Sequence, residues 1–232
     1  MKFGLTQQFP CSYLADEEEQ LLVFVDDNDA IENSYGQLIE SGFRRSGEQI
    51  YRPHCPHCNA CQSIRVLVQR FVPSKGQKRV QKRNGDIEIR ISHENKTSYY
   101  PLYETYINQR HADGSMFPAS VEQYQGFIKA NWITPLYIEF YLLQELIAVA
   151  VTDEVSNGLS ALYTFFHPDM HERSIGTFAI LTQIQHAKSL KKQYLYLGYQ
   201  VDACAKMNYK IKFLPYERFF ANKWHQFTKN VG

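Results

Sequence analysis

The densest group of chemically active residues is the run Cys55-Pro56-His57-Cys58-Asn59-Ala60-Cys61, in which a thiol recurs at every third position. A two-residue turn brings both sulfurs of such a pair to one side, so this spacing suits one Zn²⁺ ion or an iron–sulfur cluster. The fourth ligand could be Cys11, His54 or His57. We therefore predict a metal site at Cys11, Cys55, Cys58 and Cys61, the alternative being a structured loop that carries reduced thiols.

A second group of residues is cationic. Residues 75–83 would place their Lys and Arg side chains on one face of a helix, by the i, i+3, i+4 rule. These side chains are Lys75, Lys78, Arg79, Lys82 and Arg83. Such a stripe is matched to a phosphate backbone, although a solvated basic face has the same pattern. Because Arg44, Arg45 and Arg52 lie nearby in the sequence, we expect this segment to contact a nucleic acid.

The net charge of +1 conceals this basic segment. Residues 1–32 carry eight Asp and Glu against Lys2 alone, whereas residues 44–90 carry eleven Lys and Arg against three Asp and Glu. Clustered cations attract polyanions whatever the total charge is. The uneven distribution therefore indicates a polyanionic partner that the whole-chain sum does not reveal.

A third group could carry acid–base chemistry. His111 and Asp113 are two residues apart where a predicted helix ends, and such a pair can exchange protons with a substrate. Asp-Gly is also a common turn, so a purely structural role fits the same residues. Tyr199, Lys206, Tyr209 and Lys210 follow a predicted strand near the C-terminus. They either border a cleft there or belong to the packing and the surface.

The elements that position these groups change character near residue 96. Before it, short strands are predicted at 21–25, 63–71 and 87–91, and helices at 31–39 and 78–84. After it come helices at 99–110 and 120–130 and three strand-like runs at 136–143, 146–153 and 159–166. A helix after Ser174 and a strand at 194–197 complete the order.

This order, two helices, three antiparallel strands, a central helix and a further strand, is typical of the GNAT acyltransferase fold. We therefore predict an α+β protein with a mixed, largely antiparallel sheet and a central helix, and a smaller Cys-bearing N-terminal α/β region. The expected domains are residues 1–95, basic and facing a nucleic acid, and residues 96–232, the GNAT-like unit. The chain length suits one large domain or two small ones.

In GNAT acyltransferases the start of the central helix holds the phosphates of the acyl donor through a short Gly motif. The corresponding stretch here is Arg173-Ser174-Ile175-Gly176-Thr177-Phe178, which has the Arg and the first Gly but a Phe where a small residue is needed. We expect the Phe178 ring to block a pyrophosphate. Coenzyme A is therefore a disfavoured donor.

The composition narrows the class of protein. With 44% hydrophobic residues, the chain can bury a substantial core. We find no apolar run of about 18 residues and no secretory leader, so we expect a cytoplasmic protein without a membrane partner. Five cysteines, three of them within seven residues, fit free thiols or a metal better than a disulfide framework.

Six separated stretches carry a resemblance to a known family. They are Phe9-Pro10-Cys11-Ser12-Tyr13-Leu14, Ser41 to Gly47, Tyr51-Arg52-Pro53 with the Cys run, Ser63 to Val66, Arg110 to Met116, and Gly198-Tyr199 through Lys210. In this order they resemble the arginyl-tRNA–protein transferase family over essentially the whole chain. The compact length is similar to that of the bacterial branch of the family, which donates leucine.

The resemblance implies transfer of leucine from leucyl-tRNA to the N-terminal Asp or Glu of a protein, which marks that protein for N-degron degradation. It implies tRNA and protein partners, no DNA partner and no required cofactor. In eukaryotic relatives N-terminal cysteines bind an iron–sulfur cluster or zinc, but their spacing differs from the spacing here.

The reaction assigns roles to the candidate residues. The acceptor α-amine, with a pKa near 7.7–8.0, is partly neutral at pH 7, so the main demands are positioning and oxyanion stabilisation. We expect Arg110, Lys206 and Lys210 to pair with the acidic side chain of the acceptor, and Tyr199 and Tyr209 to border it. His111 or Asp113 would orient or deprotonate the amine. The tRNA would contact Arg44, Arg45, Lys75, Lys78, Arg79, Lys82 and Arg83.

Three alternatives remain at the level of sequence. Arginine instead of leucine could be the donated residue. An N-acetyltransferase that uses acetyl coenzyme A is the rival enzyme. A zinc-bearing nucleic-acid-binding module, with the second half of the chain as scaffold, is the rival without enzymatic activity.

Overall fold

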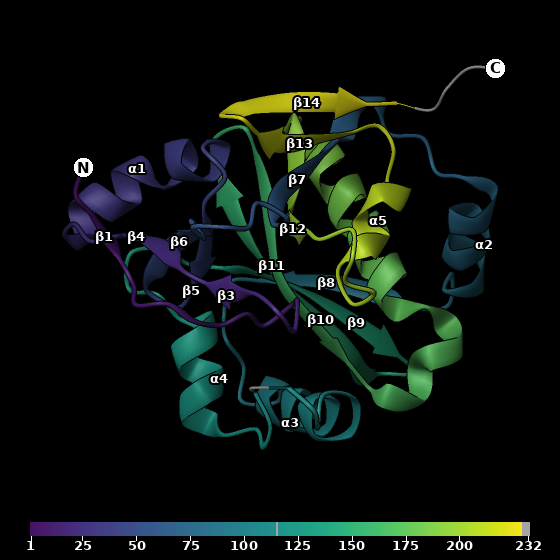
Figure 1. Cartoon of the computed structure of the whole chain (residues 1–232). Coiled ribbons are helices and arrows are strands. Elements are labelled where there is room, and N and C mark those ends of the chain that lie inside the picture. The colour runs from purple at the N-terminus through teal and green to yellow at the C-terminus, as the bar shows by residue number, and fades with distance from the viewer. Residues whose placement is uncertain (115, 229–232) are drawn as a thin grey trace.

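The computed structural model of the chain describes residues 1–114 and 116–228, which form one large sheet, a smaller sheet, a two-stranded ribbon and the helices packed around them (Figure 1). Ser115, a member of the 110–116 motif, lies outside the described residues. The functional groups identified from the sequence are distributed over both larger sheets. Their placement therefore depends on how the two sheets meet.

The large sheet has eight strands in the order β14-β13-β7-β12-β11-β10-β9-β8. Its strands are β7 (Gln62–Leu67), β8 (Glu88–Ser92), β9 (Leu136–Leu142), β10 (Glu145–Val155), β11 (Gly158–Phe166), β12 (Tyr194–Gln200), β13 (Tyr216–Phe220) and β14 (Lys223–Phe227). Every neighbouring pair is antiparallel except β11 and β12, which are parallel. The prediction of a mixed, largely antiparallel sheet in an α+β protein is confirmed.

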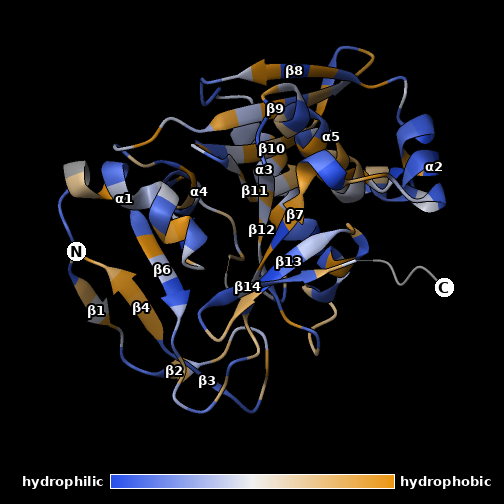
Figure 2. Cartoon of the chain, turned by 90° about the horizontal axis from the view of Figure 1, so that it is seen from above, coloured by the Kyte–Doolittle hydropathy of each residue, from blue (hydrophilic) through white to orange (hydrophobic). Residues whose placement is uncertain are grey.

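Helices cover both faces of this sheet. They are α2 (Lys75–Arg83), α3 (Tyr99–Arg110), α4 (Val121–Ile128) and the central helix α5 (Ile175–Ser189). Alternate residues of β10 face opposite layers: Ala148 and Ala150 pack in one core with α5, whereas Val149 and Val151 pack in another with α3 and α4. This period of two explains why β10 reads as a nearly continuous apolar run. Figure 1 shows α5 on one side of strands β9 to β11 and α3 and α4 on the other, and Figure 2 shows the hydrophobic residues along β4 and β7.

The smaller sheet, in the order β1-β4-β6-β5, comes from the N-terminal region. Its strands are β1 (Phe3–Leu5), β4 (Leu21–Phe24), β5 (Arg44–Ser46) and β6 (Gln49–Pro53), and β2 (Phe9–Pro10) pairs with β3 (Glu18–Glu19) beside it. Helix α1 (Asn28–Glu40) begins at Asp27, whose Oδ1 accepts a hydrogen bond from the Ala30 amide at 2.9 Å. The α1 core residues, Tyr35 among them, pack against Trp132, Val155 and Tyr196 of the other half.

The expected boundary between residues 95 and 96 does not separate the two sheets. Strands β7 and β8 both precede residue 95, and both belong to the large sheet. The chain thus crosses from the small sheet into the large one at residue 62. Short 3-10 helices η1 (Val68–Arg70), η2 (Pro168–Arg173) and η3 (Asn208–Lys212) connect the elements, and η1 ends the strand that the sequence predicts to continue to residue 71.

The expectation about Phe178 is wrong. Its ring is 7% exposed and lies in the core under α5, with its centroid 5.7 Å from that of Phe140. The side chain therefore does not occupy the space in front of the helix, where a pyrophosphate would lie. Arg173, at the start of the same stretch, forms a two-pronged ion pair with Asp86, with N–O distances of 2.8 and 3.0 Å.

Candidate active site at the splayed strands

The two parallel strands in the middle of the large sheet separate part-way along their length. Strands β11 and β12 pair only between residues 158–160 and 194–196. Beyond these pairs β11 continues to Phe166 beside β10, and β12 continues to Gln200 beside β7. Because the facing backbone edges no longer pair, the sheet opens there. We call this opening, between residues 161–166 of β11 and 197–200 of β12, the splay. Gly198, with φ +82°, lies at the irregularity in the β12 ladder.

Arg44 reaches into this opening from β5 of the small sheet. Its Nη2 donates to the carbonyl oxygen of Ala161 at 2.7 Å, at the first residue of β11 that lacks a β12 partner. Its Nη1 lies 2.8 Å from the position that a Cβ atom on Gly198 would occupy. A residue without a side chain at 198 is therefore what leaves room for the guanidinium group.

The expectation that Arg44 and Arg45 contact tRNA is wrong for this structure, because neither side chain lies on an open surface. Arg45 is 2% exposed and forms an ion pair with Asp153, also buried, at 2.7 Å. Arg44 is 9% exposed and its guanidinium lies between the strands. Local charge density indicated an exposed patch, but successive side chains of β5 point to opposite faces, and other elements cover both faces.

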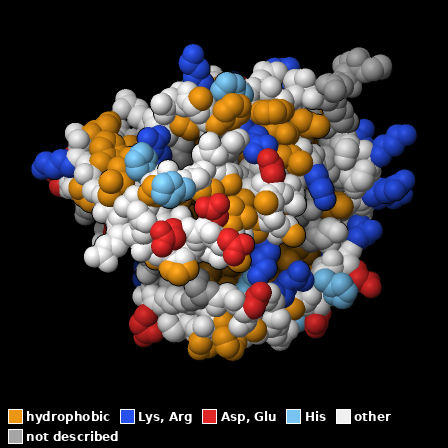
Figure 3. Space-filling model, viewed as in Figure 1, with side chains coloured by type: hydrophobic (Ala, Val, Ile, Leu, Met, Phe, Trp, Pro, Cys, Tyr) orange, Lys and Arg blue, Asp and Glu red, His pale blue; other side chains and the backbone are white. Residues whose placement is uncertain are grey.

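The basic helix α2, by contrast, is where the sequence predicts it. It begins at Ser74, where the Ser74 and Gln77 side chains form a reciprocal capping box. Gln77 and Val80 face the protein, and the five cationic side chains are exposed. They are Lys75, Lys78, Arg79, Lys82 and Arg83. Figure 3 shows Lys and Arg side chains projecting at the edge where Figure 1 draws α2.

The residues predicted for acid–base chemistry meet at the end of α3. His111 packs edge to face on Tyr106, with centroids 5.0 Å apart, and Tyr106 packs on Phe166 at the end of β11, with centroids 4.9 Å apart. The Arg110 guanidinium carbon lies 5.4 Å from the centroid of the same Phe166 ring. Burial and the charges of Lys206 and Arg110 lower the pKa of His111, so its imidazole is neutral at pH 7.

Lys206 joins this group from the segment after β12. Its Nζ lies 2.7 Å from Asp113 Oδ2, and both side chains are exposed. The hydrogen bond from Lys206 lowers the pKa of the Asp113 carboxyl, which is therefore ionised. Two residues that are 93 positions apart in the chain thus meet beside His111. Asp113 holds Lys206, and it is an acceptor of hydrogen bonds rather than a proton donor.

Lys210 lies deeper, in η3. Its Nζ donates to the carbonyl oxygens of Tyr199, at 2.7 Å, and Met207, at 3.3 Å. Burial and the charge of Arg44 lower its pKa to about 7. The Tyr209 ring centroid lies 5.0 Å from Nζ, and 39% of the Tyr209 side chain is exposed. Lys210 is thus a buried amine close to Arg44.

Tyr199 has a structural position. Its hydroxyl lies 3.1 Å from the carbonyl oxygen of Tyr51 and 3.3 Å from that of Gly42, so it ties β12 to the N-terminal region. The side chain is 5% exposed, and it forms part of the wall of the pocket that holds the cysteines. The predicted border residue Tyr199 is therefore buried, whereas Tyr209 is partly exposed.

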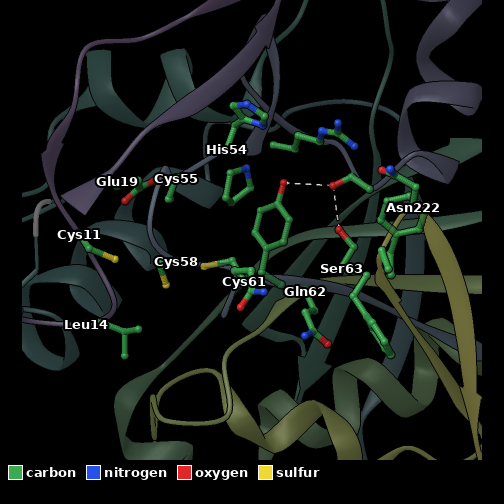
Figure 4. A pocket seen from close by; sticks show the side chains of 18 of the residues that line it. Cys11, Leu14, Glu19, His54, Cys55, Cys58, Cys61, Gln62, Ser63 and Asn222 are labelled. Atoms are coloured by element: carbon green, nitrogen blue, oxygen red, sulfur yellow. Dashed lines mark hydrogen bonds between the residues drawn. The ribbon is translucent and has the colours of Figure 1, made fainter. Parts of the chain in front are cut away.

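The four clustered cysteines line one pocket of about 290 Å³ beside β7 and the β13–β14 turn (Figure 4). Burial and the neighbouring thiols raise the pKa of Cys61 to about 12. The Cys55 Sγ instead donates to the Gln20 carbonyl oxygen at 3.8 Å. Within residues 1–114 and 116–228 no three Cys, His, Asp or Glu side chains converge closely enough to hold an ion. The described side chains as placed do not fit a metal.

Two parts of this site were not predicted from the sequence. Tyr106 and Phe166 form the aromatic floor under His111 and Arg110, and the only available signal was the spacing of four residues between Tyr106 and Arg110 on one helix face. The second is the position of Arg44 at the splay. No local pattern could indicate it, because Ala161 and Gly198 lie more than a hundred residues further along the chain.

The matches to known proteins cover both halves of this arrangement. The model of the arginine-tRNA-protein transferase C terminus matches residues 98–220, and that of the N terminus matches residues 9–79. The chain belongs to the arginine-tRNA-protein transferase family. The C-terminal match contains β9 to β13, the splay and the α3 end, and the N-terminal match contains Arg44, the cysteines and the start of α2.

Curated members of the arginine-tRNA-protein transferase family match over nearly their whole length. A protein of Pseudoalteromonas atlantica named aspartate/glutamate leucyltransferase is 58% identical over 99% of both chains. Proteins of the same name from Aeromonas salmonicida and Shewanella putrefaciens are 52% and 50% identical, over 97% and 95% of this chain and 94% of each of theirs.

Solved structures resemble this family member only distantly. A DUF2156 domain from Agrobacterium fabrum covers 90% of this chain and 79% of its own, with a TM-score of 0.47 and 10% identity. Among the described residues, none of the helices is both long and apolar enough to cross a membrane.

Proposed function

We propose that this chain transfers leucine from leucyl-tRNA to the N-terminal Asp or Glu of acceptor proteins. The observation that carries the proposal is the full-length similarity to aspartate/glutamate leucyltransferases, at up to 58% identity. The site supports it: aromatic and cationic side chains from both halves surround the splay between β11 and β12. The family role in N-degron degradation would follow from this reaction.

The reaction needs no cofactor, because the ester bond of the charged tRNA supplies the driving force. The acceptor nitrogen attacks the ester carbonyl carbon and a C–N bond forms. The bond from this carbon to the ribose oxygen then breaks, and the proton lost by the amine goes to that oxygen. Neutral His111, held by Tyr106, is the proposed carrier of this proton.

The remaining residues bind and orient the two substrates. The exposed cations of α2 are the proposed contacts to the tRNA backbone. Arg110, Lys206 and Lys210 remain the proposed cationic border of the acceptor, with Tyr209 beside them. Asp113 keeps Lys206 in place. We further propose that residues 96–232 form a GNAT-like unit, because β11 and β12 separate part-way along their length and helix α5 follows β11.

Incubation of the protein with separately charged leucyl-, arginyl- and phenylalanyl-tRNA and with peptides that begin with Asp, Glu or Lys tests the proposal. Mass spectrometry identifies the product. The expected result is a leucyl adduct on the Asp and Glu peptides only. An arginyl adduct would assign the chain to arginine transfer, and acetylation with acetyl coenzyme A but no aminoacyl product would overturn the proposal.

A further inference from the structure

Arg44 is a buried cation without a counter-ion. The residue is only 9% exposed, and among the described residues neither an Asp nor a Glu forms an ion pair with it. Nη2 has one acceptor, the Ala161 carbonyl oxygen, and Nη1 is buried with no hydrogen-bond partner. An uncompensated charge and an orphaned donor in one group cost stability unless a ligand satisfies them.

The surroundings of Arg44 add positive charge and hydroxyl groups. Lys210 is near enough for the two cations to repel each other. Arg44 also acts on the phenols of Tyr13, Tyr51 and Tyr209, where its charge partly offsets the rise in pKa caused by burial. A centre of one permanent cation, a buried amine that can take up a proton, and several hydroxyls is complementary to a compact anion with acceptor oxygens, which is the chemistry of a carboxylate.

The neighbouring Arg45 shows what such a side chain looks like when its charge is satisfied. Arg45 is one residue further along β5. Its Nε and Nη2 donate hydrogen bonds to the Asp153 carboxylate, and its Nη1 donates to the carbonyl oxygens of Gly47 and Ile128. The same chain thus pairs one buried arginine completely and leaves the other open. The open one lies at the strand splay.

We propose that Arg44 binds the side-chain carboxylate of the acceptor's N-terminal Asp or Glu and so sets the specificity of transfer. A permanent anion matches this centre better than the transient oxyanion, because the positive charge is present whether or not a reaction occurs. The inference rests on the proposed function. It assigns the binding of the acidic side chain to the buried Arg44 instead of the exposed Arg110 and Lys206.

Leucylation of four peptides that begin with Asp, Glu, Asn or Gln tests the inference in the full-length protein. The ratio of kcat/KM between the Asp and Asn peptides is measured for the wild type, Arg44→Gln and Arg44→Lys. In Arg44→Gln the ratio is expected to fall by about a hundred-fold, and in Arg44→Lys by less, since a charge remains. The ratio does not depend on the fraction of enzyme that is folded.

The variant Gly198→Ala tests the same site without changing Arg44, because a Cβ atom at residue 198 would displace the Arg44 guanidinium. It is expected to lower the Asp-to-Asn ratio while the Arg44 side chain is retained. Arg90→Gln, at an exposed arginine paired with Glu88 on β8, is the matched control and should keep the wild-type ratio.

An unchanged ratio in Arg44→Gln, with only a lower rate on all peptides, would overturn the inference and leave leucine transfer intact. If the Asp-to-Asn ratio of kcat/KM falls in Arg110→Gln or Lys206→Gln but not in Arg44→Gln, the exposed residues bind the acidic side chain and the inference is wrong. If the wild type transfers leucine to none of the peptides, the proposed function fails, and with it the inference. Calorimetric titration of the dipeptides Asp-Ala and Asn-Ala, without tRNA, should show the same preference in the wild type and its loss in Arg44→Gln.

Discussion

The guanidinium of Arg45 and the carboxylate of Asp153 form a two-pronged ion pair inside the protein, with Nε–Oδ2 at 2.8 Å and Nη2–Oδ1 at 2.7 Å. The Tyr35 hydroxyl donates to the same carboxylate at 2.6 Å. The three residues come from β5, β10 and α1, so this network joins the small sheet to the large one. Both charged side chains are inaccessible to solvent.

Removal of one partner of this pair should therefore destabilise the whole chain. Arg45→Met leaves the Asp153 carboxylate buried without its counter-ion, and a loss of about 3–5 kcal/mol in the free energy of unfolding is expected. The double variant Arg45→Met with Asp153→Leu should recover part of the loss, because no unpaired charge remains. Urea unfolding followed by circular dichroism measures both. Equal stability of the wild type and Arg45→Met would contradict the buried pair.

Local patterns were sufficient to predict the middle of the large sheet. The runs at 136–143, 146–153 and 159–166 correspond to β9, β10 and β11, because alternation and short turns are encoded by neighbouring residues. The last hairpin was not predicted. Its turn, Ala221-Asn222, has two left-handed residues with φ 49° and 56° and no glycine. The Leu143-Gln144 turn also lacks glycine, but it joins longer strands of 7 and 11 residues, whereas β13 and β14 have five residues each.

The site was predictable only in part, for a related reason. His111, Asp113 and Lys206 were identified by residue type, and the structure brings them to one place. The inward direction of Arg44 and Arg45 could not be deduced, because a charged residue is ordinarily on the surface and the partners Ala161 and Asp153 lie more than a hundred residues away. Burial of a charge is a property of the assembled sheets, which no short window of sequence contains.

The exposed cations of α2 should determine the affinity for tRNA. Replacement of Lys78 and Lys82 by Gln removes two positive charges from the outer face of the helix. The dissociation constant for tRNA should rise, and the slope of log K against log salt should flatten by about 0.7–0.9 for each phosphate that the helix no longer neutralises. Fluorescence anisotropy at several salt concentrations measures both quantities. Lys129→Gln with Lys223→Gln, exposed lysines elsewhere, is the control, and an equal weakening in this pair would refute a specific role for α2.

Protonation of His111 should determine how kcat falls at low pH. Burial and the nearby cations lower its pKa, so it becomes protonated only below its ordinary value of 6.5. With saturating peptide and leucyl-tRNA, kcat should be flat from pH 7 to 8 and should fall below pH 6.5. His111→Gln should lower kcat by about a hundred- to ten-thousand-fold and remove this decrease at low pH. A profile in His111→Gln that parallels the wild type would show that His111 does not carry the proton.

Lys210 should make stability depend on pH in the neutral to alkaline range. Burial and the charge of Arg44 lower its pKa to about 7 in the folded protein, whereas an unfolded lysine has a pKa near 10.4. Between these values the unfolded chain holds one proton more than the folded chain at this residue. The contribution of Lys210 to the free energy of unfolding therefore increases with pH, by about 1.4 kcal/mol per pH unit.

The variant Lys210→Met removes this titration, and the exposed Lys212→Met serves as its control. From pH 7.5 to 9, the difference in the free energy of unfolding between the wild type and Lys210→Met should change by about 2 kcal/mol in favour of the wild type. Lys212→Met should follow the wild-type curve throughout. Parallel curves for the wild type and Lys210→Met would mean that the amine is protonated in the folded protein over this whole range.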